Sequence, residues 1–302
     1  MCGIAGFISN REFNKEVYIT ETVQSINHRG PDDYGYYNSE NVLILNTRLS
    51  IIDLENGNQP FTNKKESIIV VQNGEIYNYV EVREKLKKEG CVFNTESDTE
   101  VILKAYEKYK TKCFELFNGM FAIAIYDKEK GELILGRDRL GVKPLYIYQN
   151  NDEIFFSSEI KSFLHVDSFK KTLNNQSIHN YLKYNYIPIP NTIFENVRHV
   201  LPGSYLQINV KTFNIKTTKY WDITNTKEMD NVSEEDVFDK IDEILEDAIK
   251  IRLRSDVGIG AFLSGGLDSS IVCAVTKEKF NIGLDSYTIG FKEKKYDESD
   301  WA

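Results

Sequence analysis

Cysteine and histidine are scarce in this 302-residue sequence, with four of each, and their spacing excludes the common metal frameworks. There is no C-x-x-C pair and no H-x-x-x-H or H-E-x-x-H spacing, so a structural zinc site is not expected. Four widely separated cysteines also give no disulfide framework. We interpret Cys91, Cys113 and Cys273 as small buried hydrophobic side chains. Cys2 is set apart by its position.

Long apolar runs and an excess of positive charge are also missing. No stretch approaches the roughly 18 apolar residues that cross a membrane. Lysine and arginine number 37 against 46 acidic residues, a net charge of -9. This balance argues against nucleic acid as a main partner, because phosphate binding needs clustered basic residues. The first six residues lack the basic and apolar segments of a secretory signal, so we expect a cytoplasmic protein.

Short β-type runs and helices share the first two thirds of the chain. Apolar runs rich in β-branched and aromatic residues predict strands at 42–45, 68–71, 121–126, 133–135, 145–148 and 154–156, with a hairpin turn at 127–131. Helices are predicted at about 16–27, at 80–89 before Gly90, and at 98–112. Ser97 and Glu100 have the spacing of a capping box. Because several runs are apolar throughout, we expect sheets buried on both faces and covered by helices, a layered α+β domain.

The last third has a different organisation. A polar stretch predicts a linker at 221–232, between a first domain at 2–220 and a second at 233–302. Ser233 and Asp236 cap a predicted amphipathic helix whose apolar face carries Val237, Ile241, Ile244, Leu245 and Ala248. A strand at 259–263, a helix at 270–277 and a strand at 286–291 follow, the β-α-β pattern of a doubly wound α/β domain. Such a sheet needs several strands to close its core. We therefore expect the chain to be a fragment of a longer protein.

Cys2 is placed to act as an N-terminal nucleophile. Removal of Met1, which a small second residue permits, would leave a free α-amine beside the thiol. An α-amine has a reference pKa of about 7.7–8.0. One residue would then supply both the nucleophile and the base. Taken alone, a cysteine at position 2 is more often a coincidence, so the case depends on the other motifs.

Amide hydrolysis also needs donors for the oxyanion and anchors for both ends of the substrate. Asn73 and Gly74 follow a predicted strand and offer a side-chain NH2 and a backbone N–H, although Asn-Gly after a strand is commonly just a turn. Arg48 has the donors to bind a carboxylate in two parallel hydrogen bonds, or to form a surface ion pair. Asp98 is suited to bind an ammonium group or, alternatively, to complement a helix dipole.

Six ordered motifs carry a resemblance to a known family. They are MCGIAG at 1–6, HRGPD at 28–32, RLSIID at 48–53, NGEIYN at 73–78, SDTE at 97–100 and GRDRLGVKPLY at 136–146. Together they closely resemble the class II glutamine amidotransferase domain of asparagine synthetases. The resemblance implies a four-layer α-β-β-α sandwich of the N-terminal-nucleophile type, followed by the start of a doubly wound ATP-pyrophosphatase domain.

The same resemblance assigns roles to the candidate residues. Cys2 would form a γ-glutamyl thioester, and Asn73 with Gly74 would form the oxyanion hole. Arg48 would bind the carboxylate of glutamine. Asp98 and the Gly74–Glu75 stretch would hold its amino end.

A second motif, SGGLDSS at 264–270, lies between the predicted strand 259–263 and the predicted helix 270–277. Consecutive glycines let backbone N–H groups turn toward an anion, and the helix adds its positive end. P-loop spacing is absent, so γ-phosphoryl transfer is not indicated. The motif resembles the pyrophosphate loop of ATP pyrophosphatases, which implies ATP with Mg2+ and leaves the metal ligands unassigned. The implied ATP-binding residues are Leu263, Ser264, Gly265, Gly266, Asp268, Ser269 and Ile289.

Together the two resemblances imply a glutamine-hydrolysing asparagine synthetase, an ATP-dependent carbon–nitrogen ligase. Cys2 would release ammonia from glutamine, ATP would adenylate aspartate, and ammonia would then give asparagine, AMP and pyrophosphate. The expected partners are glutamine, aspartate and ATP, with a homodimer as one assembly and with neither nucleic acid nor membrane.

Two alternatives stay open at this point. One is a related amidotransferase that acts on a sugar acid, a peptide or an antibiotic precursor, although β-lactam synthetases usually lack the nucleophile. The other is a fragment that only hydrolyses or binds glutamine. We expect this chain alone to hydrolyse glutamine without making asparagine.

Overall fold

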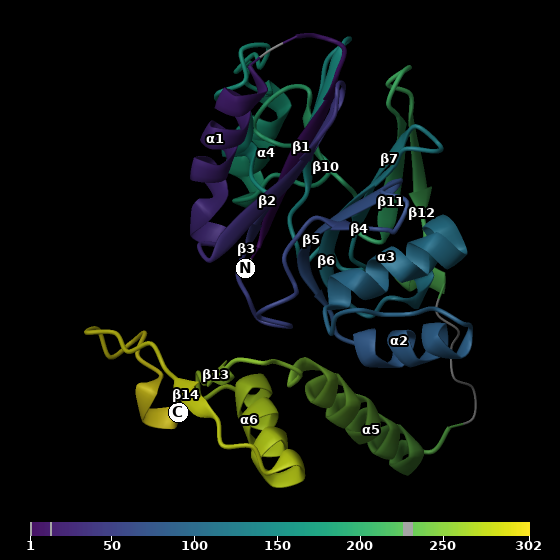
Figure 1. The fold of residues 1–302 in the computed structure, drawn as a ribbon. Coiled ribbons are helices and arrows are strands. Elements are labelled where there is room, and N and C mark those ends of the chain that lie inside the picture. The colour runs from purple at the N-terminus through teal and green to yellow at the C-terminus, as the bar shows by residue number, and fades with distance from the viewer. Residues whose placement is uncertain (1, 13, 226–231) are drawn as a thin grey trace. The chain divides into compact units, whose positions relative to one another are not determined.

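The computed structural model describes residues 2–12, 14–225 and 232–302. The chain divides into two compact units, residues 1–226 and 227–302 (Figure 1). Of the linker predicted at 221–232, the described part contains a 3₁₀ turn at Ile223–Asn225, and residues 226–231 lie outside the described residues.

Two six-stranded antiparallel sheets form the centre of the first unit. The first sheet has the spatial order β10 (Val197–His199), β8 (Tyr146–Gln149), β9 (Glu153–Ser157), β1 (Gly3–Ser9), β3 (Val42–Arg48) and β2 (Asp33–Asn38). The second has the order β12 (Ile215–Lys219), β11 (Ser204–Asn209), β7 (Glu132–Arg137), β6 (Gly119–Asp127), β5 (Ile68–Ile76) and β4 (Phe61–Thr62). Asp127 pairs with Glu132, which confirms the hairpin predicted between β6 and β7.

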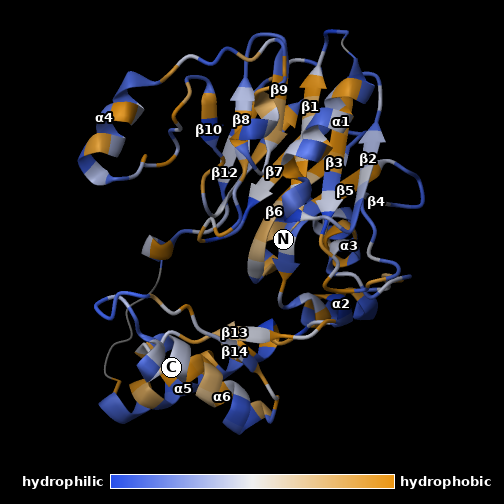
Figure 2. Cartoon of the chain, turned by 90° about the vertical axis from the view of Figure 1, so that its left-hand side faces the viewer, coloured by the Kyte–Doolittle hydropathy of each residue, from blue (hydrophilic) through white to orange (hydrophobic). Residues whose placement is uncertain are grey.

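Helices cover the outer face of each sheet (Figure 1). α1 (Lys15–Ile26) packs its buried residues against the first sheet. α2 (Tyr79–Lys88) and α3 (Asp98–Tyr109) pack against the second sheet, and the exposed side of α2 is strongly hydrophilic (Figure 2). A further helix, α4 (Asn175–Tyr184), follows β9 in the chain. The layers confirm the predicted α-β-β-α sandwich.

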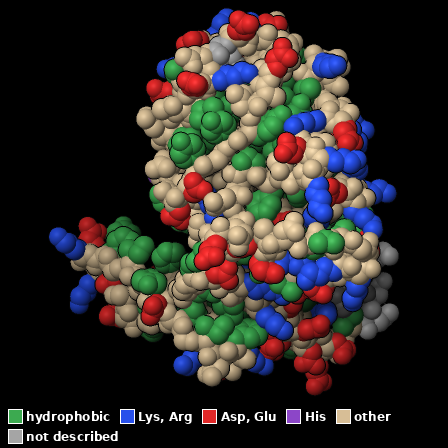
Figure 3. All heavy atoms as spheres, viewed as in Figure 1, with side chains coloured by type: hydrophobic (Ala, Val, Ile, Leu, Met, Phe, Trp, Pro, Cys, Tyr) green, Lys and Arg blue, Asp and Glu red, His purple; other side chains and the backbone are tan. Residues whose placement is uncertain are grey.

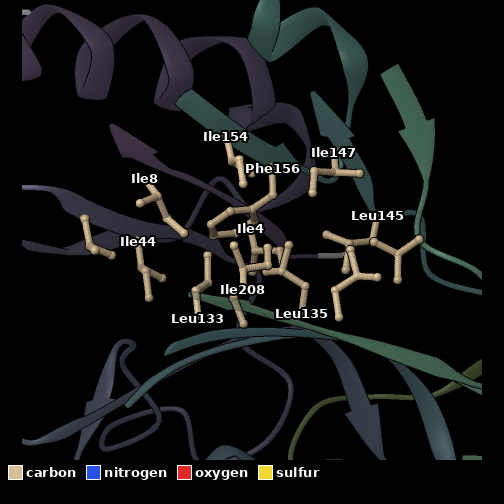
Figure 4. Packing of buried hydrophobic residues seen from close by; sticks show 14 of the residues in the cluster. Ile4, Ile8, Ile44, Leu133, Leu135, Leu145, Ile147, Ile154, Phe156 and Ile208 are labelled. Atoms are coloured by element: carbon tan, nitrogen blue, oxygen red, sulfur yellow. The ribbon is translucent and has the colours of Figure 1, made fainter. Parts of the chain in front are cut away.

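The central core lies between the two sheets. Along β3, Val42 and Ile44 face the second sheet while Leu43 and Leu45 face α1, as strand alternation requires. Figure 4 shows Ile4, Ile8 and Ile44 of the first sheet opposite Leu133, Leu135 and Ile208 of the second. All seven residues of β1 and all seven of β3 are buried. This confirms that these central strands are buried on both faces, which is why β3 begins as a continuous apolar run.

Several elements were not predicted from the sequence, and β1 is the most important of them. Glycine normally weakens a strand, which hides β1 in the sequence. A Cβ at Gly6 would lie 2.2 Å from the carbonyl oxygen of Leu43 and 2.6 Å from the ring of Phe156. The close approach of these groups requires glycine here. The other elements missed were β2, β4, α4, β10, β11 and β12.

The prediction at the start of α3 was partly wrong. Ser97 does cap the helix, but its hydroxyl accepts from the N–H of Thr99 at 3.2 Å. The carboxylate of Glu100 turns instead to the N–H groups of Asn94 and Thr95, at 3.0 and 2.7 Å, so no capping box forms. α3 also ends at Tyr109, because Lys110 has a φ of 53° and the chain continues as a 3₁₀ segment to Leu116.

The second unit begins with α5 (Glu234–Arg252), on which Ser233 and Asp236 form a reciprocal capping box. β13 (Gly260–Phe262) and β14 (Asp285–Tyr287) pair in parallel and are joined by α6 (Leu267–Phe280), which confirms the β-α-β unit. α6 begins three residues earlier than predicted, at Leu267. The predicted apolar face of α5 is largely exposed at Val237, Ile241 and Ile244.

The surface carries charged side chains of both signs, as the numbers of acidic and basic residues in the sequence lead us to expect. Acidic and basic side chains are interspersed over the face shown in Figure 3. Within the described ranges, no helix combines the length and apolar character needed to cross a membrane.

Candidate active site

A cavity of about 430 Å³ brings together most of the predicted glutamine-site residues. Its walls include Cys2, directly before β1, Arg48 of β3, Gly74 and Glu75 of β5, and Asp98 of α3. These residues are up to 96 positions apart in the chain, from Cys2 to Asp98. The antiparallel pairing of β1 with β3 places Cys2 and Arg48 at neighbouring strand ends. The second sheet supplies Gly74 and Glu75 from the end of β5.

Cys2 lies directly before β1, and its thiol is hydrogen-bonded to the backbone of Leu49. The N–H of Leu49 donates to Sγ at 3.4 Å, and Sγ lies 3.6 Å from the carbonyl oxygen of the same residue. The side chain of Arg29 donates to the carbonyl oxygen of Cys2 at 3.0 Å. Burial raises the pKa of the Cys2 thiol, and the bond from Leu49 opposes this. A thiol in this environment needs a base to become an effective nucleophile.

Asn73 and Gly74 lie near the end of β5, beside β6. The Asn73 side chain is fully buried, and its Nδ2 donates to Ser158 Oγ at 3.2 Å. An amide NH2 carries two hydrogens, so this bond leaves one of them for a second acceptor. Gly74 has a φ of +140°, a conformation that side chains rarely adopt. The Ser158 hydroxyl also accepts from the N–H of Ile4 at 3.0 Å, which ties the amide to the nucleophile strand.

We expect Gly74→Ala to lower the free energy of unfolding by about 3 kcal/mol, because the new Cβ meets fixed backbone in a strained conformation. That Cβ would lie 1.9 Å from the carbonyl oxygen of Met120. The matched control is Gly90→Ala, where φ is also positive but no atom lies within 4 Å of the new Cβ. Urea denaturation gives the loss in free energy of unfolding for both variants. The loss in Gly90→Ala reports the cost of the backbone conformation alone, and the additional loss in Gly74→Ala reports the steric clash. Equal losses in the two variants would contradict the prediction.

Asp98 and Glu75 form the acidic side of the cavity. Asp98 Oδ2 accepts from the N–H of Ile76 at 2.9 Å and from Gln72 Nε2 at 3.0 Å. Burial is the largest influence on both carboxyl groups and raises the pKa of each. Asp98 raises the pKa of Glu75 further, while Lys143 lowers it. Two carboxylates held close together and away from water are suited to bind a cationic group.

Arg48 reaches the cavity, but its guanidinium also organises the loop that follows β3. It donates to the carbonyl oxygens of Asp53 at 2.6 Å and Leu54 at 3.3 Å, and to the side chain of Asn58. A Cβ at Gly57 would lie 2.4 Å from Arg48 Nη2, so glycine leaves the space that the guanidinium occupies. To bind a substrate carboxylate, Arg48 would share or exchange these bonds.

Several residues that complete the site were given no role by the sequence reasoning. Gln59 accepts from the N–H of Gln72 at 2.6 Å and donates to Thr99 Oγ1 at 3.3 Å, and Gln72 in turn holds Asp98. Of these residues, only Gln72 was indicated by the sequence, as a polar side chain directly after the apolar run at 68–71. The spacing of residues in the sequence does not indicate that Ser158 and Lys143 belong to the site. Strand pairing brings Ser158 to the site, and a loop brings Lys143.

The SGGLDSS motif forms a compact loop at the start of α6. Gly266 is the N-cap residue and Gly265 has a φ of +75°. Ser269 Oγ accepts from the N–H of Ser264 at 3.2 Å and donates to the carbonyl oxygen of Gly266 at 3.1 Å. Asp268 and Ser269 therefore belong to the first turn of the helix and not to a free loop.

Leu263 and Ile289 lie near this loop at the carboxyl ends of β13 and β14. The hydroxyl of Thr288 donates to the carbonyl oxygen of Leu263 at 2.7 Å, which links the two segments. Ile289 follows β14 instead of lying in a strand as predicted, and its side chain is exposed. Among the described residues, no group of three or more histidine, cysteine or acidic side chains is arranged to hold a metal ion.

Two family models match different parts of the chain. A family model described as a glutamine amidotransferase domain matches residues 1–221, and one described as asparagine synthase matches residues 240–302. Asparagine synthetase [glutamine-hydrolyzing] 1 of Bacillus subtilis is 37% identical over 100% of this chain and 48% of its own length. A putative asparagine synthetase [glutamine-hydrolyzing] 2 of Methanocaldococcus jannaschii is 40% identical over 99% of this chain and 61% of its own length. The chain thus spans about half the length of the curated relatives it matches.

Solved structures share the fold at low sequence identity. Glutamine phosphoribosylpyrophosphate amidotransferase of B. subtilis superposes with a TM-score of 0.54 at 18% identity, over 98% of this chain and 68% of the other. An allosteric regulatory enzyme of purine biosynthesis gives a TM-score of 0.55 at 17% identity, over 99% of this chain and 67% of the other. With its family match over residues 1–221 and its four-layer sandwich, the chain belongs to the glutamine amidotransferase domain family.

Proposed function

We propose that the first unit is a glutaminase with Cys2 as its nucleophile, the amidotransferase part of a glutamine-dependent asparagine synthetase. The observation that carries the proposal is the cavity in which Cys2 meets Gly74, Asp98 and Arg48. The cavity is lined by the carboxylates of Asp98 and Glu75 and by the guanidinium of Arg48. These opposite charges match the ammonium and carboxylate groups of an amino acid.

In the proposed reaction, Met1 is removed and the α-amine of Cys2 takes the proton of the thiol. The sulfur attacks the side-chain carbonyl carbon of glutamine, and the oxyanion forms against Asn73 and the backbone at Gly74. The carbon–nitrogen bond breaks, and ammonia leaves with the proton from the amine. Water then cleaves the γ-glutamyl thioester to give glutamate and restore the thiol.

Substrate orientation follows from the charges. Asp98, with Glu75, would hold the ammonium group of glutamine, and Arg48 its carboxylate. The raised pKa of the Cys2 thiol supports the role of the α-amine, because burial by itself keeps this thiol protonated at neutral pH.

For the second unit we propose ATP binding at Ser264, Gly265, Gly266, Asp268 and Ser269, with Leu263 and Ile289 toward the adenine. The β-α-β unit with a glycine turn before α6 supports an anion at this position. Mg2+, aspartate as acceptor, a homodimer and a cytoplasmic location complete the proposal. The names of the relatives favour aspartate over sugar-acid or peptide acceptors.

A thiol-directed glutamine analogue tests the proposal directly. The protein is incubated with a diazoketone analogue of glutamine, and the adduct is located by peptide mass spectrometry. We expect one adduct, on Cys2, in chains that lack Met1, together with loss of glutamate release. An adduct on Cys91 or Cys273 instead, or a chain that keeps Met1 and stays unlabelled, would contradict it.

A further inference from the structure

Lys143 is a buried cation in the glutamine cavity that the proposed reaction does not use. It is 2% exposed and lines the same cavity as Cys2 and Glu75. Buried lysines are rare in proteins, because removing an ammonium from water is costly without compensating charge. Its position inside a site for amide hydrolysis therefore calls for a chemical reason.

The chain around Lys143 is held on both sides. Asp138 accepts from the N–H groups of Lys143 and Val142, both at 2.9 Å, and from the N–H of Phe121 at 3.1 Å. Arg137 Nε donates to the carbonyl oxygen of Lys143 at 2.8 Å. The adjacent Asp138 and Arg137 thus fix the Lys143 backbone from both its amide and its carbonyl side. A backbone held this firmly makes Lys143 a built part of the cavity wall.

The charges around Cys2 come from five elements of the fold. Arg48 lies on β3, Glu75 on β5 and Asp98 on α3. Arg29, from the 3₁₀ turn before β2, reaches the main chain of Cys2. Lys143, from the loop after β7, opposes the two carboxylates.

We propose that Lys143 tunes this site electrostatically, favouring the thiolate of Cys2 and keeping Glu75 ionised to receive the ammonium group of glutamine. The inference rests on the proposed function of Cys2. An ammonium group within a few ångströms favours the anionic forms of a thiol and a carboxyl group, most strongly where water is excluded.

Opposing influences act on the pKa of Lys143 in the cavity. Burial lowers the pKa of Lys143, and Glu75 and Cys2 both oppose this by favouring the charged ammonium. Arg29 also lowers this pKa, while Asp138 raises it. Reciprocally, Lys143 lowers the pKa of Glu75 against the effect of burial. Glu75 and Lys143 therefore support each other's charge inside the cavity.

The test is the pH profile of Cys2 alkylation in Lys143→Met, Lys143→Gln and Lys143→Arg. Iodoacetamide is used at fixed concentration from pH 5.5 to 10, and Cys2 modification is followed by peptide mass spectrometry. We expect the two neutral variants to shift the midpoint upward by about half to one pH unit, slowing alkylation below the midpoint by about 3- to 10-fold. Lys143→Arg should restore part of the shift.

Controls separate this role from a structural one. Lys216→Met removes an exposed lysine from β12 and should leave the midpoint unchanged. Thermal melting shows whether each variant is folded, and an apolar side chain in place of a buried charge is often tolerated. A folded neutral variant with the wild-type midpoint, or with a lower one, would overturn the inference. Absence of Cys2 labelling by the glutamine analogue in the wild type would instead refute the proposed function itself.

Discussion

Cys2→Ala is expected to lower glutamate release from glutamine by about 1,000-fold or more, because no other group in the site can form the thioester. Cys2→Ser should be nearly as inactive, since the hydroxyl is a far weaker nucleophile than the thiol. The measurement is steady-state glutamate release, together with glutamine binding by calorimetry. Binding should survive in both variants, because Arg48, Asp98 and Glu75 are intact.

The matched control for this prediction is Cys273→Ser on α6. Cys273 is a free, partly buried cysteine, as Cys2 is, but it does not line the glutamine cavity. Its replacement should leave glutamate release within about two-fold of the wild type, as expected for a residue outside the chemistry. Substantial glutamate release by Cys2→Ala would contradict the covalent mechanism.

Asp98→Asn has the second largest expected effect, a rise of about 100-fold in the KM for glutamine. The substitution preserves shape, and the asparagine oxygen can still accept from the N–H of Ile76. It removes the negative charge that would hold the substrate ammonium. Initial rates over a wide glutamine range give KM and kcat separately, and we expect most of the loss in KM.

Stability should change in the opposite direction to binding. Burial raises the pKa of Asp98, so the folded state binds its proton more tightly than the unfolded state does. The stability linked to this proton is fully present below the unfolded pKa of about 3.9 and is lost as the pH rises through the folded value. Asparagine removes this penalty at neutral pH, so Asp98→Asn should unfold at an equal or higher urea concentration than the wild type.

The pH dependence gives an independent check on Asp98. The part of wild-type stability that is linked to Asp98 and Glu75, whose pKa values are both raised by burial, should fall as the pH rises from about 4 toward neutrality. Asp98→Asn should show a shallower fall over the same range. A variant that loses both stability and binding would indicate a structural carboxylate and would count against the ammonium-binding role.

Local sequence patterns predicted the elements whose composition or capping is visible in residues close together in the chain. The runs at β3, β5, β6 and β7 are apolar because both faces of each sheet are covered, and that composition is visible in the sequence. Ser233 and Asp236 cap α5 as predicted, through a capping box whose bonds lie within four residues. The capping box at Ser97 does not form, because the carboxylate of Glu100 accepts from the N–H groups of Asn94 and Thr95 in the preceding loop instead.

The sequence by itself determined the layered fold and identified the side chains that carry the proposed chemistry. Both the apolar runs and the ordered motifs consist of residues that are close together in the chain. Tertiary structure alone decided which groups meet. β1 pairs with β3 and the second sheet closes over it, so Cys2, Asp98 and Lys143 share one cavity although the first and last are 141 positions apart. The tertiary structure also shows that the guanidinium of Arg48 is bound by the loop that follows β3, and that Lys143 is buried in the cavity it shares with Glu75. Such long-range juxtaposition depends on strand pairing and loop packing, which leave no periodic signal along the chain.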